Sequence, residues 1–171
     1  VLAIIAPIEY QGLRGLLPLL MGGASKPLFI LLDRVTDVRN LGAIARSAEL
    51  FGANAIILSS KQRARIDDEA IKASAGALLK LAVCREQSLS AAVDTLQTSG
   101  IKIAAADSND GMNIVDVPFD QPIALLMGSE DEGVHPELLK KCDYRYKIPQ
   151  IGSIDSFNVS VAAGISLYEI A

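Results

Sequence analysis

Residues 123–133 read IALLMGSEDEG, and this stretch decides the fold class. Its first five residues are all apolar, which predicts a strand buried on both faces, because a half-exposed strand would alternate apolar and polar side chains. Glycine and acidic residues end the run abruptly and predict a loop at the carboxyl end of the strand. Ligands of open α/β sheets usually bind at such loops, so Glu130 lies where chemistry is expected.

The remainder of the chain repeats this order of strand, polar loop and helix. Residues 135–142, HPELLKKC, predict a short helix with Pro136 in its first turn and lysines near its end, as the helix dipole favours. Residues 144–149, YRYKIP, predict a strand ended by a proline. A loop rich in glycine, hydroxyl and amide groups follows at residues 152–158 and leads into the apolar segment 159–171.

Upstream, further apolar runs predict buried strands with helical patterns between them. The strands are residues 27–33, 55–58, 81–84 and 101–107, and the helices are residues 40–51, 69–80 and 88–100. Asn40 is placed to cap the first of these helices, and Gly52 is placed to end it. Residues 108–121 predict an irregular link. Continuously apolar strands that alternate with helices are typical of a parallel sheet with helices on both faces, so we predict an α/β fold.

The first 27 residues form a lead-in to this pattern. Residues 1–8, VLAIIAPI, predict a strand, since the run is too short to span a bilayer and lacks a basic segment before it. Residues 10–20 predict a short helix and residues 21–27 a turn. We therefore expect residues 1–27 to be a lead-in and linker, residues 28–171 to be the main domain, and the protein to be cytoplasmic with no membrane attachment.

Composition limits the classes of function. A length of 171 residues with 50% hydrophobic residues suits one ordered domain. A formal net charge of -4 argues against a large surface for duplex nucleic acid, although a local basic surface remains possible. Cys84, Cys142 and the single histidine, His135, give neither a disulfide framework nor the spacing of a zinc site. We expect both cysteines to be buried bystanders and predict no metal.

Several common catalytic motifs are missing. Neither the dinucleotide fingerprint G-x-G-x-x-G nor the phosphate-binding loop G-x-x-x-x-G-K-[ST] occurs in the sequence. The nucleophile motif G-x-S-x-G is also absent. These absences argue against an ordinary Rossmann dehydrogenase, a nucleoside triphosphatase and a serine hydrolase.

A small set of polar residues remains as candidates: Asn40, Arg46, Glu130, Ser156 and Asn158. Each has an ordinary structural explanation. Asn40 is suited to cap a helix, Arg46 to lie on the surface or pair with Glu49, and Glu130 to belong to a solvated turn. Ser156 and Asn158 are suited to cap the last helix. Asn40 and Arg46 are six residues apart, or about 600° around a helix, so they do not share a face.

Four ordered blocks nevertheless form a specific pattern. They are NLGAIARSAELFGANAIIL, KASAGAL, IALLMGSEDEG and IPQIGSIDSFNVSVAAGISLYE. In this order they resemble the blocks of the SpoU (TrmH-like) RNA ribose 2′-O-methyltransferases of the SPOUT superfamily, from about residue 28 to the end of the chain. Within the family, the chain is most similar to the branch that methylates a guanosine ribose in large-subunit (23S) rRNA.

The resemblance implies a parallel α/β sheet with a C-terminal deep trefoil knot, S-adenosylmethionine as cofactor, RNA as substrate, and a homodimer. Many relatives also carry a small N-terminal RNA-binding domain, so residues 1–27 are expected to be a lead-in strand and linker to such a domain, outside this sequence. The general rule that chains avoid knots would not have predicted one. The family's catalytic positions fall on Asn40, Arg46, Glu130, Ser156 and Asn158. Its cofactor contacts fall on the backbone around Leu126, Met127 and Gly128 and around Ile148, and on the turn formed by Ser156, Phe157, Asn158 and Val159. Gly128 suits a backbone that approaches a ligand closely. Gln150 and Ile151, where the family commonly has methionine, and Phe157, where it commonly has leucine, depart from the pattern.

The resemblance also suggests a mechanism. Some members are assigned an arginine base, but an arginine titrates at about 12.5–13.8, so a neutral guanidinium at pH 7 costs about 7 to 9 kcal/mol. Our hypothesis is that charged Arg46 clamps an RNA phosphate beside the target ribose, with Glu130 and Asn40 orienting Arg46. Ser156 and Asn158 would fix the ribose or the loop.

Other functions remain open at this point. The substrate could be a tRNA ribose, and the fold could serve as a non-catalytic RNA-binding module. A nucleotide-handling α/β domain without a methyl donor is a further possibility. Retention of all five candidate residues weighs against the non-catalytic module, and binding of S-adenosylmethionine would exclude the domain without a methyl donor.

Overall fold

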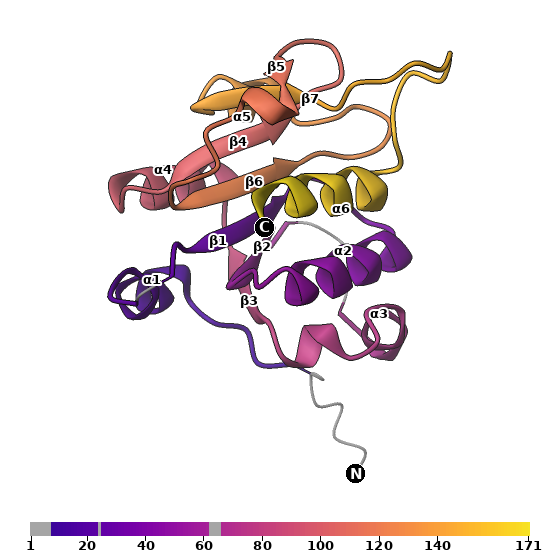
Figure 1. Ribbon diagram of the computed structural model, residues 1–171. Coiled ribbons are helices and arrows are strands. Elements are labelled where there is room, and N and C mark those ends of the chain that lie inside the picture. The colour runs from indigo at the N-terminus through magenta and orange to yellow at the C-terminus, as the bar shows by residue number, and fades with distance from the viewer. Residues whose placement is uncertain (1–7, 24, 62–65) are drawn as a thin grey trace.

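The computed structural model describes residues 8–23, 25–61 and 66–171, and within them seven strands form one sheet (Figure 1). The strands are β1 (Leu28–Leu32), β2 (Ala55–Ser59), β3 (Ala82–Glu86), β4 (Lys102–Ala106), β5 (Met112–Asn113), β6 (Ile123–Met127) and β7 (Tyr144–Lys147). Their spatial order is β3-β2-β1-β6-β4-β7-β5, and neighbouring strands are parallel. The predicted parallel sheet is confirmed. The strand predicted for residues 1–8 lies almost entirely outside the described residues.

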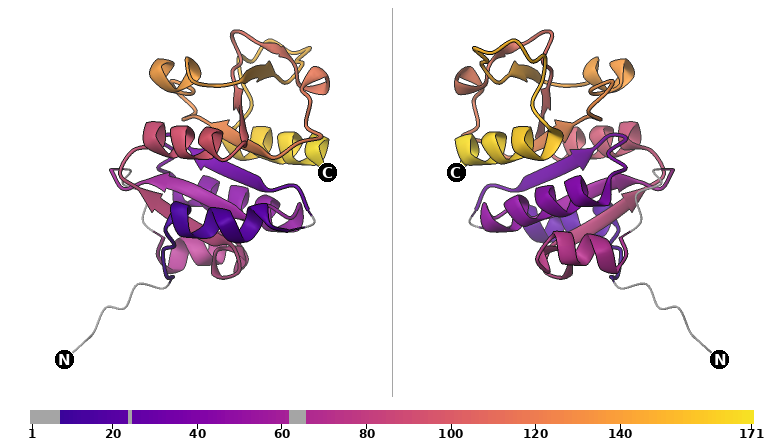
Figure 2. Two further views of the ribbon diagram at one scale, coloured as in Figure 1. Left: turned by 90° about the vertical axis from the view of Figure 1, so that its left-hand side faces the viewer. Right: turned by 90° about the vertical axis from the view of Figure 1, so that its right-hand side faces the viewer.

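Helices cover both faces of this sheet (Figure 2). The helices are α1 (Leu13–Met21), α2 (Val38–Leu50), α3 (Asp68–Ala73), α4 (Leu89–Thr98), α5 (Pro136–Leu139) and α6 (Val159–Ile170). Strand β1 shows why its sequence is continuously apolar: Ile30 packs with residues of α2 and α6, whereas Phe29 and Leu31 pack with residues of α1 and α4. All five residues of β1 are buried, as a strand between two helical layers requires.

The strand order reverses at β6. Strands β1, β2 and β3 follow one another outward along the sheet, whereas β6 is inserted between β1 and β4. Leu126 of β6 is in register with Leu31 of β1 and with Ala105 of β4. The carboxyl ends of β1, β6, β4 and β7 therefore reach one edge of the sheet, where α/β folds form ligand crevices.

Helix α2 begins two residues earlier than predicted, and Asn40 is not its cap. The cap is Asp37, whose carboxylate accepts a hydrogen bond of 2.8 Å from the backbone nitrogen of Arg39. Asn40 is the third helical residue, so its side chain is free for other contacts. The predicted stop is confirmed: Gly52 has a φ of 73°, and the nitrogen of Ala53 donates back to the oxygen of Ala48 at 2.8 Å.

The helix predicted for residues 69–80 is interrupted. Helix α3 ends at Ala73, and a short 3-10 helix, η1 (Ala77–Leu79), follows. Ala75 and Gly76 lie between them with φ values of 51° and 82°, and the nitrogen of Gly76 donates to the oxygen of Ile71 at 3.0 Å. This is the C-terminal cap that a glycine favours, and the periodic pattern on both sides of it concealed the break.

The predicted irregular link, residues 108–121, contains regular structure. Strand β5 extends the sheet beyond β7, with Met112 in register with Tyr146. A 3-10 helix, η2 (Ile114–Asp116), comes next and is capped by the side chain of Asn113. Two residues are too short a strand for an apolar pattern to reveal.

Helix α6 is held by its neighbours along its whole length. It runs beside α2, and a Cβ built on Gly164 would lie 3.8 Å from Oγ of Ser47 (Figure 1). At its carboxyl end, the ring of Tyr168 meets that of Phe51 edge to face at 6.3 Å. Inside the core, the hydroxyl of Ser166 lies 2.7 Å from that of Tyr146 in β7. These contacts fix the amino end of α6 beside the amino end of α2.

Among the helices in the described parts of the chain, none combines the length and the apolar character that crossing a membrane requires.

Candidate functional site

A cavity of about 490 Å³ opens at the carboxyl ends of β6, β4 and β7. The segments that line it are the loop after β4, the loop between β6 and α5, the end of β7 and the loop that precedes α6. A cavity of this size suits a small molecule or cofactor. The residue run that decided the fold class therefore also leads into the candidate site.

The cavity gathers most of the residues predicted to contact a cofactor. Those that line it are Met127, Gly128, Ile148, Ser156, Phe157 and Val159. Leu126 does not line it, because its side chain points to the opposite face of the sheet and packs in the core beneath α1 and α4. Asn158 lies next to the cavity rather than in its lining.

Three of the predicted catalytic residues meet at one edge of the cavity. Nδ2 of Asn40 donates to Oε1 of Glu130 at 3.2 Å, and Nδ2 of Asn158 donates to Oδ1 of Asn40 at 3.2 Å. Asn158 also donates to the same oxygen of Glu130. We call Asn40, Glu130 and Asn158 the amide–carboxylate cluster. It joins α2, the loop after β6 and α6, which are far apart in sequence.

Asn158 has a second role as the cap of α6. Its Oδ1 accepts a hydrogen bond of 2.9 Å from the backbone nitrogen of Ser160. The capping explanation for Asn158 is therefore confirmed, but it does not exclude a functional one: the oxygen caps the helix while the nitrogen reaches Glu130 and Asn40. Ser156 is exposed, lines the cavity two residues earlier and has no hydrogen-bond partner among the described residues.

Arg46 does not join the cluster. It lies on the exposed side of α2 and has no hydrogen-bond or ion-pair partner among the residues that the structure describes. Glu49, its suggested partner, instead lies 3.4 Å from Nζ of Lys80. Our hypothesis required Glu130 and Asn40 to orient Arg46. Within the described chain they make no hydrogen bond or ion pair with it. The face of α2 that carries Asn40 is not the face that carries Arg46.

Gly128 is required by its own loop. A Cβ on Gly128 would lie 2.0 Å from the carbonyl carbon of Gly133, so the two ends of the loop touch. The nitrogen of Gly133 also donates to the oxygen of Ser129 at 2.9 Å, which closes the loop. The expectation that Gly128 makes room for a ligand is thus unnecessary, because backbone packing alone demands glycine.

Comparisons with known proteins show the family of this chain. Residues 27–168 match the model of the SpoU rRNA Methylase family. The chain belongs to this family. A tRNA/rRNA methyltransferase of Archaeoglobus fulgidus, named as uncharacterized, is 38% identical over 167 residues, which cover 98% of this chain and 73% of that protein. Another of that description, from Synechocystis, is 39% identical over 97% of this chain and 43% of that protein.

Two solved structures resemble this SpoU-family chain closely in fold. One is the AdoMet-bound rRNA methyltransferase from Sinorhizobium meliloti, with a TM-score of 0.84, 28% identity, and coverage of 95% of this chain and 60% of that one. The other is the SpoU methyltransferase AviRb from Streptomyces viridochromogenes in complex with AdoMet, with a TM-score of 0.84, 28% identity, and coverage of 95% and 64%. The chain thus spans less than two thirds of these solved relatives.

Sequence reasoning missed part of the wall of this SpoU-family cavity. Asp107, Ser108 and Asn109 line it after β4. The carboxylate of Asp107 accepts a hydrogen bond of 3.0 Å from the nitrogen of Asn109, and its own nitrogen donates to the oxygen of Tyr146 at 2.8 Å. A signal was available, because residues 101–107 already predicted a strand whose carboxyl end meets the same edge.

Charge on the cavity wall is mostly negative. The acidic residues that line it are Asp107, Glu130, Asp131, Glu132 and Asp155, and the described lining holds one basic residue, Lys147. Such a wall favours a ligand with positive charge. The phenol of Tyr146 stays neutral there, because burial raises its pKa well above the usual range, although the hydrogen bond with Ser166 opposes the shift.

The described residues bear on two further kinds of chemistry, that of a metal site and that of a reactive thiol. They contain no group of three or more histidine, cysteine or acidic side chains that could hold a metal ion. Cys84 is buried as predicted, and burial raises the pKa of its thiol to about 11. Cys142 is only half-buried, contrary to expectation, yet burial still raises its pKa to about 12. Both thiols are protonated at neutral pH and are poor nucleophiles.

Proposed function

We propose that this SpoU-family chain transfers a methyl group from S-adenosylmethionine to a ribose 2′-hydroxyl of RNA, with a guanosine of 23S rRNA as the preferred target. The observation that supports this most directly is the amide–carboxylate cluster beside the cavity. The similarity in fold to two AdoMet-bound methyltransferases supports it further. A tRNA ribose is the second candidate substrate, because the names of the sequence relatives include both kinds of RNA.

The residues present suit the cofactor. Ile148, Phe157 and Val159 offer apolar surface for an adenine ring, and the backbone at Met127 and Gly128 offers polar groups at the strand end. When bound, S-adenosylmethionine supplies an electrophilic methyl group on a positively charged sulfur, and an acidic wall favours that charge. The cavity thus combines an apolar surface that suits the adenine ring with an acidic surface that suits the positively charged sulfur.

Substrate positioning is the chemistry that this chain can supply. An in-line displacement gains most from holding the hydroxyl and the methyl group in line. We propose that Arg46 remains charged and clamps a phosphate next to the target ribose, since a guanidinium forms paired hydrogen bonds with phosphate oxygens. The 2′-hydroxyl then loses its proton late in the transfer, with that phosphate as the assisting acceptor. Glu130 is already engaged by two amides, so we assign it to ordering Asn40 and Asn158 rather than to orienting Arg46.

In a homodimer, Arg46 of one subunit could lie at the cavity of the other. Helix α6 is mostly apolar, and its polar exceptions are Ser160, Ser166 and Glu169. The side of the helix away from the core leaves Val161 49% and Tyr168 72% exposed. Leu50, four residues after Arg46 on α2, is 71% exposed. An exposed apolar surface beside a basic residue is typical of a protein interface. We infer that two copies pack through this surface and that Arg46 of the partner subunit completes each site.

We also infer the family's trefoil knot at the C-terminus. The strand order supports it, because the chain leaves β7 near one side of the sheet and returns as α6 to pack against α2 near the other. The strand order alone does not require a knot. Pulling the chain by its two ends would decide, because a knotted chain cannot be drawn into a straight line.

Labelled methyl transfer tests the function. Purified protein would be incubated with tritiated S-adenosylmethionine and either ribosomal RNA or tRNA from cells that lack the enzyme. We expect label in RNA at a ribose that resists alkaline cleavage. Binding of S-adenosylmethionine without transfer to either RNA would support the non-catalytic module instead, and no binding at all would contradict the proposed cofactor.

A further inference from the structure

Arg34, directly after β1, has an unusual backbone conformation. Its φ is 60°, which side chains with a Cβ rarely adopt. Glycine or asparagine would be the ordinary choice at such a position. A residue strained in this way persists where the contacts around it hold the conformation in place.

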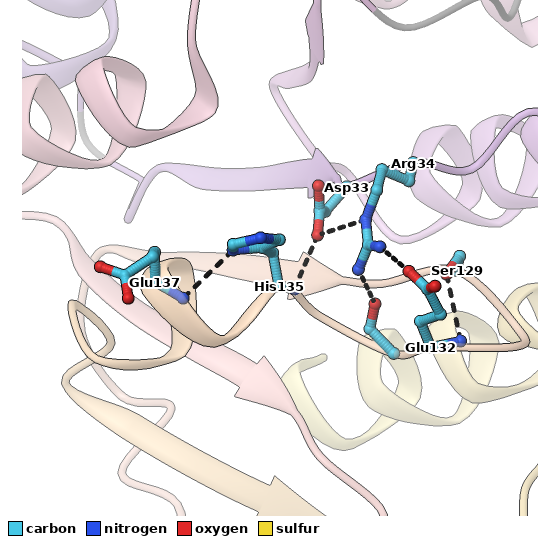
Figure 3. Close-up of polar contacts among 7 residues, drawn as sticks. Asp33, Arg34, Ser129, Glu132, His135 and Glu137 are labelled. Atoms are coloured by element: carbon cyan, nitrogen blue, oxygen red, sulfur yellow. Dashed lines mark hydrogen bonds and ion pairs between the residues drawn. The ribbon is translucent and has the colours of Figure 1, made fainter.

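The guanidinium of Arg34 joins the end of β1 to the loop after β6 (Figure 3). It contacts the carboxylate of Glu132, and its Nη2 donates to the carbonyl oxygen of Gly133 at 3.0 Å. Its Nε lies 3.4 Å from Oδ2 of Asp33. Strands β1 and β6 are paired in register up to Leu32 and Met127, so the residues that follow them meet directly.

Asp33 secures the other end of the same loop. It is 7% exposed, and its Oδ2 accepts a hydrogen bond of 2.8 Å from the backbone nitrogen of His135. Its own nitrogen donates to the oxygen of Met127 at 2.8 Å. The carboxylate of Asp33 is therefore shared between Arg34 and His135, and together they hold the loop at Glu132, Gly133 and His135 (Figure 3).

This loop carries the carboxylate of the amide–carboxylate cluster. Asn40 and Asn158 belong to helices that pack in the core, whereas Glu130 stands on the exposed loop between Gly128 and Gly133. Residues 128–134 also form one wall of the cavity. The position of Glu130 therefore depends on what orders the loop. Asn40 and Asn158 contact Glu130 itself, whereas Arg34 reaches the loop from the end of β1, at Glu132 and Gly133.

We propose that Arg34 is a positioning residue that holds the loop of residues 128–134 in place for cofactor binding and methyl transfer. It acts through Glu132 and Gly133 and touches neither the cofactor nor the RNA. The inference rests on the proposed function, since it assigns Arg34 a role in that site. Surface ion pairs contribute little to overall stability, so the effect of Arg34 belongs in cofactor affinity rather than in folding.

Arg34→Gly is the informative variant, because glycine suits the left-handed backbone and removes only the guanidinium contacts. We expect its Kd for S-adenosylmethionine, measured by calorimetry, to rise about tenfold, as loss of loop order predicts. Hydrogen exchange at residues 128–135 should become faster, while the melting temperature stays near that of the wild type. Unchanged affinity and unchanged exchange in Arg34→Gly would overturn the inference.

A double-mutant cycle tests the pairing with Glu132. Glu132→Gln keeps the size of the side chain and should weaken cofactor binding, partly by releasing Arg34 and partly by removing a charge from the cavity wall. In the double variant Arg34→Gly/Glu132→Gln the combined loss should be smaller than the product of the two single losses, since the pair is broken only once. Single losses that multiply fully in the double variant would refute the pairing. If the wild type itself binds no S-adenosylmethionine, the proposed function fails instead, so the two failures are distinguishable.

Discussion

The amide–carboxylate cluster and the outer face of α2 differ in how complete they are. Asn40, Glu130 and Asn158 satisfy one another within a single chain, beside a formed cavity. Arg46, on the other face of the same helix as Asn40, has no polar partner among the described residues and lies near exposed apolar side chains. A single chain thus forms the cavity and the cluster beside it, whereas the RNA-binding role that we propose for Arg46 requires a second molecule.

The largest expected effect comes from Arg46→Ala. Losing the phosphate clamp should slow single-turnover methyl transfer about 100-fold or more. Cofactor affinity should stay unchanged, and the free energy of unfolding should move by less than about 0.5 kcal/mol, because Arg46 is exposed and unpaired in the described chain.

Arg46→Lys sharpens the same point. Lysine keeps the charge but lacks the planar fork, so we expect a slow rate for it as well. A near-normal rate in Arg46→Lys would argue against both a clamp and a base at this position. Calorimetry with S-adenosylmethionine is the control, since both variants should bind it like the wild type.

Gly128→Ala should damage the other region of the comparison, the cavity and the amide–carboxylate cluster. The new Cβ would collide with the backbone of Gly133, which cannot move without opening the loop. We expect a loss of about 1 to 3 kcal/mol in the free energy of unfolding, and cofactor affinity reduced at least about tenfold, since a misplaced wall disturbs the site. Gly164→Ala is the matched control, because its Cβ would have an ordinary contact of 3.8 Å with Ser47. Equal tolerance of both substitutions would contradict the account of the loop.

The two roles of Asn158 can be separated by a pair of variants. Asn158→Ala removes both the helix cap and the amide donor, and should cost about 1 kcal/mol of unfolding free energy. Asn158→Ser retains a capping oxygen but not the amide. We expect Ser to restore most of the stability and none of the activity, with methyl transfer about tenfold slower in both variants. Full activity in Asn158→Ser would show that the cluster is structural only.

The smallest effect concerns Asp143, at the amino ends of β4 and β7. Burial raises the pKa of its carboxyl, but hydrogen bonds from Lys102, Gln97 and the nitrogen of Ile103 together hold that pKa below its usual range. A lowered folded-state pKa stabilises the protein above the unfolded pKa, and this contribution is lost as pH falls through the folded value. The stability gap between wild type and Asp143→Asn should therefore be constant above about pH 5 and shrink below it.

Unfolding in denaturant from neutral to acid pH measures that gap. Asp143 lies at the edge of the sheet opposite the cavity, so methyl transfer at neutral pH should not change. A gap that widens in acid would mean that the sign of the shift is wrong.

The sequence predicted the sheet and the cavity because both depend on local patterns. Apolar runs such as residues 123–127 are visible as strands, and polar loops at their carboxyl ends mark the cavity. The contacts of Glu130 with Asn40 and Asn158 could not be derived this way, since strand order determines them and β6 is inserted out of sequence. The positions themselves came from resemblance to a family.

The errors have equally local causes. Asn40 was predicted as a cap because the apolar periodicity begins after it, yet the helix is capped three residues earlier, by Asp37. The side chain of Leu126 faces away from the cavity, because alternate residues of a strand face opposite sides; the backbone contact that the family resemblance implied for Leu126 stays a prediction. The contact between Arg34 and Glu132 could not be predicted, because it arises only when β1 and β6 pair.

Subunit complementation tests the central claim most directly. Arg46→Ala and Glu130→Ala would each be inactive alone, and they would be mixed under conditions that exchange subunits. If Arg46 of the partner subunit completes each site, half of the dimers are mixed and each carries one intact site, so the rate should reach about one quarter of the wild-type rate. A mixture as inactive as its components would contradict the account, because it would place Arg46 and Glu130 in a site formed by a single chain.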